Sequence, residues 1–179
     1  MLFRSILGTG VGGGIVDDGR LWVGPNAIAG EWGHNQLPWP TLEESSGPRC
    51  YCGRTGCIET FLSGPALAAD HHRHTGRRLA GFEIAELAAH GDGDCGATLG
   101  RYAERLARSL AAVINLIDPD AIVLGGGVSG IAMLYQEVPA LWLRHIFSDH
   151  VATRLLPPVH GDSSGVRGAA RLWRPDEEW

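Results

Sequence analysis

Three cysteines stand close together in the run Cys50-Tyr51-Cys52-Gly53-Arg54-Thr55-Gly56-Cys57. Thiols at this spacing can converge on one metal ion, because the glycines between them permit sharp backbone turns. A closed tetrahedral zinc site needs a fourth ligand, and His34 is the best candidate because it lies upstream in the same irregular stretch. The pattern therefore favours a structural zinc site held by His34, Cys50, Cys52 and Cys57 over ordinary buried cysteines or a redox group.

Other cysteine and histidine side chains give weaker metal signals. Cys95 stands alone, and we expect it to be a small buried apolar residue. His71, His72 and His74 fall on one predicted helix, where adjacent side chains point in different directions and cannot all bind one ion. A solvated helix face is the better interpretation of that histidine cluster.

Two carboxylates flank the predicted metal ligands. Glu31 precedes His34 by three positions, and Glu59 follows Cys57 by two. A shared zinc ion would bring both glutamates into one neighbourhood, although either glutamate alone would be interpreted as a solvated surface residue. Paired carboxylates suit a polyhydroxyl ligand, because each oxygen accepts hydrogen bonds from hydroxyl groups.

Two glycine-rich segments follow predicted strands. In 8–14, glycines let backbone N–H groups approach an anion, and Thr9 adds a hydroxyl. This segment is not a Walker motif, since no Lys-Ser or Lys-Thr follows, and not a dinucleotide fingerprint, since a strand follows it. A hairpin bend explains it equally well. Gly125-Gly126-Gly127 ends a buried strand at the edge where open α/β sheets bind ligands, so a nucleotide between the two segments is expected.

Hydrophobic periodicity and turn residues predict an α/β architecture. The predicted strands lie near 6–7, 15–16 and 121–124, with a hairpin turn at 17–20 and an irregular excursion over 24–60. The predicted helices span 63–76, 82–90, 98–117 and 131–147, with a last short helix at 165–172.

Composition narrows the functional classes. The chain has 179 residues, 44% of them hydrophobic, and a formal net charge of -5. These values disfavour disorder and give no general attraction to nucleic acid or anionic lipid, so neither partner is expected. No apolar run reaches the roughly 18 residues of a membrane helix, and the opening residues are too short for a signal peptide. The expected location is cytoplasmic, where clustered thiols stay reduced and suit metal binding.

Together these motifs resemble the ROK family of sugar kinases. The resemblance covers essentially the whole chain and is carried by Gly8-Thr9-Gly10 with its following glycines, Gly30-Glu31-Trp32-Gly33-His34, Cys50 to Glu59, Asp118-Pro119-Asp120, and Gly125 to Gly127. The bacterial fructokinase (manno-fructokinase) branch is most similar in His34-Asn35-Gln36-Leu37-Pro38-Trp39, Cys50-Tyr51-Cys52-Gly53, Ile58-Glu59-Thr60-Phe61 and the run from His160 to Gly168.

This resemblance implies an actin-like ATPase fold of the ribonuclease H type, with residues 1–179 forming the C-terminal lobe and carrying a zinc-stapled loop. It implies the zinc ligands named above, and a homodimer. Magnesium would accompany ATP, because phosphoryl transfer requires charge neutralisation. The implied ligand contacts are Glu31, His34 and Glu59 around a hexose, Gly8, Thr9 and Gly10 near the ATP phosphates, and Gly125, Gly126 and Gly127 near adenosine.

One departure from the family concerns catalysis. Family members begin with a lobe that carries an Asp-x-Gly-Gly-Thr motif, and an Asn-Asp pair before the first glycine loop supplies the catalytic base. Neither is found in this chain, so the catalytic Asp is expected upstream of Met1. The first hypothesis is phosphate transfer from ATP to the 6-hydroxyl of fructose, and the alternative is a non-catalytic sugar-binding or interaction module. A ROK-type repressor is disfavoured, because those relatives carry a preceding helix-turn-helix and the chain is acidic.

Overall fold

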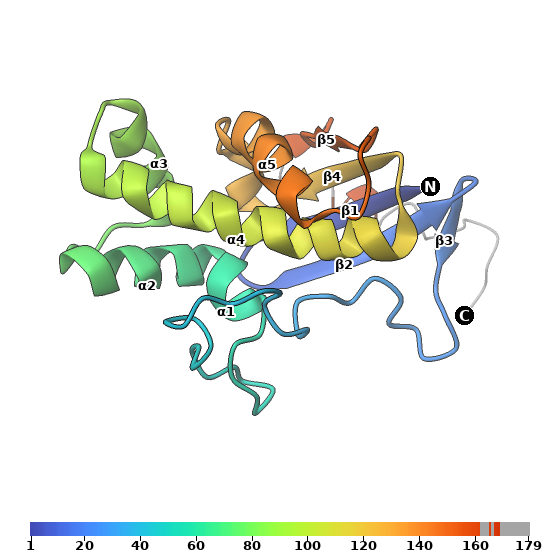
Figure 1. The fold of residues 1–179 in the computed structure, drawn as a ribbon, viewed down its shortest axis with the longest axis horizontal. Coiled ribbons are helices and arrows are strands. Elements are labelled where there is room, and N and C mark those ends of the chain that lie inside the picture. Colours follow the sequence, from blue (N-terminus) through green and yellow to red (C-terminus); the bar gives the residue numbers. More distant parts are fainter. Residues whose placement is uncertain (162–164, 166, 169–179) are drawn as a thin grey trace.

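A mixed five-stranded sheet organises the computed structural model, which describes residues 1–161, 165, 167 and 168 (Figure 1). The strand order is β3-β2-β1-β4-β5. β1 pairs antiparallel with β2 and parallel with β4, so a meander and a parallel pair share one central strand. The strands are β1 (Leu2–Leu7), β2 (Val11–Asp17), β3 (Arg20–Trp22), β4 (Ala121–Gly125) and β5 (Arg154–Leu156).

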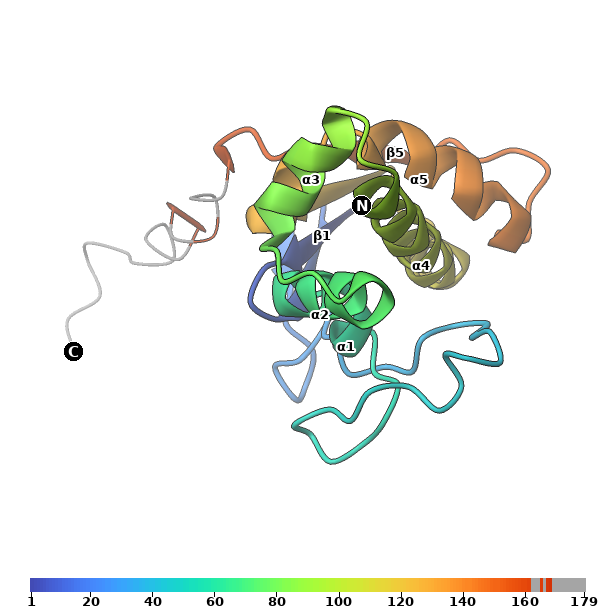
Figure 2. The same cartoon turned by 90° about the vertical axis from the view of Figure 1, so that its left-hand side faces the viewer.

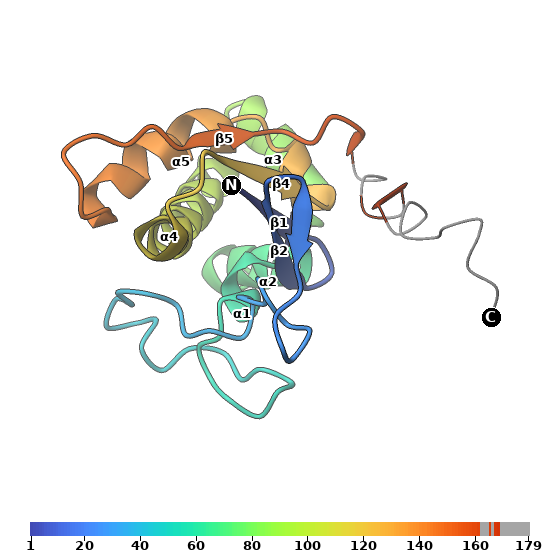
Figure 3. The ribbon, with the colours of Figure 1, turned by 90° about the vertical axis from the view of Figure 1, so that its right-hand side faces the viewer.

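Helices cover one face of this sheet. Figure 3 shows α4 and α5 together on the same side of the strands. The alternating burial of β1 agrees, since Phe3, Ser5 and Leu7 are buried while the residues between them are partly exposed. The helices are α1 (Glu59–Leu62), α2 (Gly64–Thr75), α3 (Gly81–Ala89), α4 (Gly93–Ile117) and α5 (Leu134–Trp142), with 3-10 turns at Gly127–Gly130 and Leu143–His145.

Local sequence signals account for most element ends. The predicted hairpin turn at 17–20 forms with left-handed Asp18 (φ 47°) and Gly19 (φ 72°). The Ser63 side chain accepts a hydrogen bond from the Ala66 N–H at 3.3 Å and caps α2. The helix ends at left-handed Gly76, as predicted. The lone Cys95 is fully buried.

Two predicted helices have other boundaries in the structure, and two elements were missed. Helix α4 begins at Gly93 rather than at 98, because Asp92 caps it by accepting the Cys95 N–H at 3.0 Å. The helix predicted over 131–147 is shorter, with α5 flanked by 3-10 turns and containing Pro139, which lacks a backbone donor. Helix α1 and strand β5 were not predicted. The helix predicted at 165–172 falls largely outside the described residues.

The irregular excursion predicted over 24–60 is confirmed as far as Ile58, since Glu59 begins helix α1. Residues 23–58, called the excursion below, contain no helix and no named strand, and they project on the side of α1 and α2 (Figures 1 and 2). Their buried anchors Trp32, Leu37 and Ile58 join the hydrophobic core. In the part of the chain that the structure describes, none of the helices has both the length and the apolar character needed to cross a membrane.

Candidate functional site

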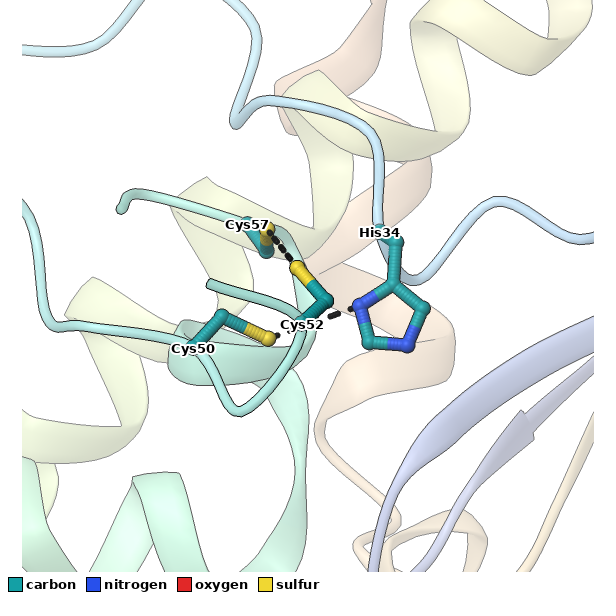
Figure 4. Close-up of side chains that lie close together, drawn as sticks. All are labelled: His34, Cys50, Cys52 and Cys57. Atoms are coloured by element: carbon teal, nitrogen blue, oxygen red, sulfur yellow. Dashed lines mark hydrogen bonds between the residues drawn. The ribbon is translucent and has the colours of Figure 1, made fainter. Parts of the chain in front are cut away.

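One imidazole and three thiols meet in the excursion (Figure 4). The ligand atoms of His34, Cys50, Cys52 and Cys57 all lie within 4.8 Å of one another. Cys50 Sγ lies 3.4 Å from His34 Nδ1, and the Sγ atoms of Cys52 and Cys57 are 3.6 Å apart. Ligands at zinc distances on a regular tetrahedron are separated by about 3.7 Å. The four predicted residues therefore fit a zinc ion in chemistry and in spacing.

Backbone turns and short bridges bring these ligands together. Gly53 (φ 90°) and Gly56 (φ 72°) adopt the left-handed region, which lets the cysteine run fold back on itself. The Leu37 N–H donates to the Gly56 carbonyl, and the Ile58 N–H donates to the Asn35 carbonyl, both at 2.9 Å. These two hydrogen bonds hold the segment after the imidazole beside the segment around the last thiol.

The thiols differ in their pKa. Burial and the neighbouring thiols raise the pKa of Cys57 to about 12. A hydrogen bond from the Arg54 backbone N–H, opposed by desolvation, lowers the pKa of Cys52 to about 7. Metal ligation requires thiolates, so a bound dication would have to displace the proton of the buried Cys57.

The side chains of the two predicted carboxylates, from the excursion and from α1, lie against the first residues of β2. Glu59 Oε2 accepts a hydrogen bond from the Val11 N–H at 2.9 Å. Glu31 Oε1 accepts from the Gly33 N–H at 3.2 Å, and its Oε2 lies 3.7 Å from the position of a β-carbon on Gly12. Both glutamates therefore approach adjacent residues of one strand, as expected from the zinc neighbourhood.

Close backbone packing fixes this arrangement. A β-carbon on Gly33 would lie 2.0 Å from the Val11 carbonyl oxygen, so only glycine fits there. The Gly33 carbonyl accepts the Glu59 N–H at 2.9 Å, and Trp32 Nε1 donates to the Gly12 carbonyl at 2.8 Å. The Glu31–His34 segment is thus attached both to β2 and to the residue after the cysteine run.

A pocket of about 390 Å³ lies on the other side of the β1–β2 turn. Its walls come from the ends of β1 and β4 and from the first turns of α2 and α3, and its lining residues are Gly8, Thr9, Gly64, Pro65, Leu67, Gly81, Phe82, Gly127, Val128 and Ile131. Its volume lies within the range of small-molecule sites. The first N–H groups of α2 already have acceptors, since Gly64 donates to the Gly8 carbonyl and Ala66 to the Ser63 hydroxyl, so α2 would favour an anionic group of a ligand through its helix dipole.

The residues of the two glycine-rich segments that were expected to contact a nucleotide lie in different places. Gly8, Thr9 and Gly127 line the pocket. Gly10 faces the carboxylates, because a β-carbon there would lie 2.6 Å from Glu59 Oε2. Gly125 and Gly126 pack on β1 instead of lining the pocket.

The contributions of α2 and α3 to the pocket were not predicted. The Gly64-Pro65 pair at the start of α2 was a signal for them, because helix amino-termini bind anions. The Gly64 N–H donates to the Gly8 carbonyl at 2.7 Å, which joins this helix start to the glycine turn. Phe82 offered no comparable signal, since only the folded chain brings α3 to the pocket.

Residues 1–176 match the ROK family. The N-acetyl-D-glucosamine kinase of Photobacterium profundum is 40% identical over 171 residues, covering 93% of this chain and 56% of the relative. The enzyme of the same name from Salmonella newport is 39% identical over 180 residues, covering 98% and 59%. The chain thus spans less than two thirds of these relatives. They are not named as fructokinases, so the fructokinase branch is not confirmed.

Solved structures show the same fold. A ROK family glucokinase from Streptomyces griseus, crystallised with glucose and AMPPNP, aligns with a TM-score of 0.83 at 27% identity, covering 96% of this chain and 59% of that one. A Thermus thermophilus ROK hexokinase gives 0.80 at 29% identity, with coverage of 95% and 57%. A ROK transcriptional regulator, a homologue of E. coli MLC, gives 0.74 at 27% identity, with coverage of 87% and 41%. The mixed α/β fold therefore matches the actin-like ATPase fold of ROK kinases.

Proposed function

The chain belongs to the ROK family, and we propose that it forms the part of an ATP-dependent hexose kinase that binds both substrates. The observation that carries this proposal is the turn between β1 and β2. Gly8 and Thr9 line a nucleotide-sized pocket, and Gly10 lies against Glu59 on the opposite side. ATP, which donates the phosphate, and the sugar hydroxyl that receives it would lie on opposite sides of these three residues.

Each side of the turn supports a definite role. The turn and the positive end of the α2 dipole would attract the ATP phosphates, and the apolar residues Val128, Ile131 and Phe82 would contact the base. Magnesium bound with ATP would supply charge neutralisation. Glu31, Glu59 and His34 would orient the sugar by accepting and donating hydrogen bonds at its hydroxyls, which leaves one hydroxyl facing the phosphates.

The zinc site has a structural part in this proposal. His34, Cys50, Cys52 and Cys57 would bind the ion and hold the excursion in the conformation that presents Glu31 and Glu59. Zinc would supply binding energy to a segment that contains no helix and no named strand. The carboxylates of Glu31 and Glu59, and not the zinc ion, would bind the sugar.

Three sugars are candidates for the hexose that this protein would phosphorylate. The cysteine-run motifs favour fructose, whereas the curated relatives are named for N-acetyl-D-glucosamine and the aligned kinase for glucose. We propose transfer to the 6-hydroxyl of a hexose, with all three sugars compared directly. The catalytic Asp expected upstream of Met1, a cytoplasmic location and a homodimer belong to the same proposal.

Calorimetry of the 179-residue chain tests the sugar site. We expect one of the three hexoses to bind, and Glu59→Gln to weaken that binding by at least 10-fold, because a carboxylate hydrogen bond contributes about 1.5–3 kcal/mol. Glu43→Gln, at an exposed position, is the matched control and should bind normally. Equal affinity in wild type and Glu59→Gln would refute the assigned sugar site.

Turnover separates the kinase from the alternative, a non-catalytic sugar-binding module. The chain fused behind the amino-terminal part of a curated relative should release ADP in the presence of the preferred hexose. Sugar binding without ADP release from that fusion, with the relative itself active in the same assay, would favour the binding module.

A further inference from the structure

A second cavity, of about 320 Å³, lies between the excursion and the helices that pack beside it. Helices α1, α2 and α4 contact one another on this side of the molecule (Figure 2). The excursion supplies the wall between positions 43 and 48, and the three helices supply Phe61, Arg73 and Arg105. None of the lining residues is a proposed ligand of the sugar, the zinc ion or the nucleotide, so this cavity is separate from the candidate site.

Arg105 brings a buried cation to the cavity. Only 5% of this residue is exposed, and two of its three nitrogens have partners: Nε donates to Glu44 at 2.6 Å and Nη1 donates to Asp70 at 2.8 Å. The third nitrogen, Nη2, has no hydrogen-bond partner among the described residues, and it is not one of the enclosed polar atoms that lack a partner. Since Arg105 lines the cavity, Nη2 is a donor that a ligand there can reach.

The charges around the cavity favour an anion. Arg73 Nη1 lies 3.5 Å from Oδ1 of Asp70, the oxygen that Arg105 also contacts, so two guanidinium groups lie close together. The buried carboxylates Asp70 and Glu44 are shared by four arginine side chains: Arg73, Arg101, Arg105 and Arg108. Glu43 also lines the cavity, but its side chain is 77% exposed and its charge is screened by solvent. Positive charge is therefore in excess.

We propose that this cavity binds a small oxyanion, a carboxylate or a phosphate, between Arg73 and Arg105. Guanidinium groups recognise both kinds of oxyanion through charge-assisted hydrogen bonds. Pro48 and Phe61, whose ring centroid lies 5.2 Å from Arg105 Cζ, offer apolar surface to the organic part of such a ligand. The bound anion would join the excursion to α2 and α4. The inference depends neither on the proposed zinc ion nor on kinase activity.

Calorimetric titrations with inorganic phosphate and with acetate, at constant ionic strength, test this site. We expect one of the two anions to bind, and the tighter of the two identifies the class of ligand. Arg73→Ala should weaken that binding by about 10-fold or more, because a charge-assisted hydrogen bond is lost. Arg78→Ala is the matched control, since it removes an exposed arginine that lines a different cavity, and it should bind the anion like wild type.

Phosphate could also bind at the glycine turn between β1 and β2, so a second measurement locates the anion. In nuclear magnetic resonance spectra of the wild-type chain, the Arg105 Nε–H and the backbone N–H groups of Ser46 and Gly47 should shift as the anion is added. Binding of neither anion, equal affinity in Arg73→Ala and wild type, or shifts confined to the β1–β2 turn would each overturn the inference.

Discussion

The two sides of the candidate site are built in different ways. The nucleotide-sized pocket lies among the ends of β1, β4, α2 and α3, whose positions follow from backbone hydrogen bonds and core packing. The excursion that carries the predicted sugar and zinc ligands has no regular element of its own. Its conformation depends on scattered backbone hydrogen bonds, a few buried anchors and charged side chains, and the proposed ion, so the two sides should respond separately to mutation, pH and metal removal.

A buried group of charges is the second attachment of the excursion. Arg105 on α4 donates to Glu44 at 2.6 Å and to Asp70 at 2.8 Å, and all three side chains are buried. Arg108 donates to Glu44 at 2.8 Å and to the carbonyls of Pro38 and Trp39. These contacts hold the middle of the excursion on α4, before the cysteine run.

Removing the positive charge of Arg105 should lower the free energy of unfolding more than any other change considered below. Arg105→Ala leaves Glu44 and Asp70 buried with fewer partners, and breaking such a cluster costs about 3–5 kcal/mol. Chemical denaturation would measure the loss in free energy of unfolding. Arg144→Ala, whose exposed side chain lies 3.5 Å from Glu104, should change it by less than about 1 kcal/mol. Equal losses in the two variants would show that the buried cluster does not stabilise the excursion.

The second largest effect on stability is expected at low pH, where Glu44 of the same buried cluster becomes protonated. Burial alone would raise the pKa of Glu44, but hydrogen bonds from Arg105, the Thr41 N–H and Arg108 hold it at about 2, below its ordinary value of 4.5. The carboxylate therefore stabilises the fold fully above pH 4.5, and this contribution of about 3 kcal/mol is lost as the pH falls towards 2. Unfolding measured from pH 7 to pH 3 should show a steeper decline in wild type than in Glu44→Gln. Parallel pH profiles would contradict this account.

A smaller effect is expected on the side of the pocket. Gly126 has φ 80° and ψ 175°, and a β-carbon there would lie 2.4 Å from the Leu7 carbonyl oxygen. Gly126→Ala should destabilise the fold by about 2 kcal/mol and weaken binding of an ATP analogue, because the backbone of the strand ends must move. Gly127→Ala meets open space and should change stability by less than about 0.5 kcal/mol. Metal analysis should give identical zinc contents for both variants, and loss of zinc in Gly126→Ala would show that the two sides are coupled.

The sequence predicted local features better than contacts between residues that are far apart along the chain. The three-and-four periodicity predicts the body of α4, and the cysteine spacing predicts which side chains gather, because both depend on neighbours along the chain. The bond between Arg105 and Glu44 joins residues 61 positions apart, and no local pattern indicates it. The wall that Phe82 gives the pocket likewise exists only once α3 packs. The start of α4 was predictable from the Asp92 cap and was missed.

The central claim is that one ion joins His34 to the cysteine run and so presents Glu31 and Glu59 to a sugar. X-ray absorption at the zinc edge, on purified and reduced chain, tests it most directly. We expect one zinc per chain with three sulfur ligands at about 2.3 Å and one nitrogen ligand at about 2.0 Å. Absence of zinc, or a coordination shell of oxygen and nitrogen alone, would contradict the account.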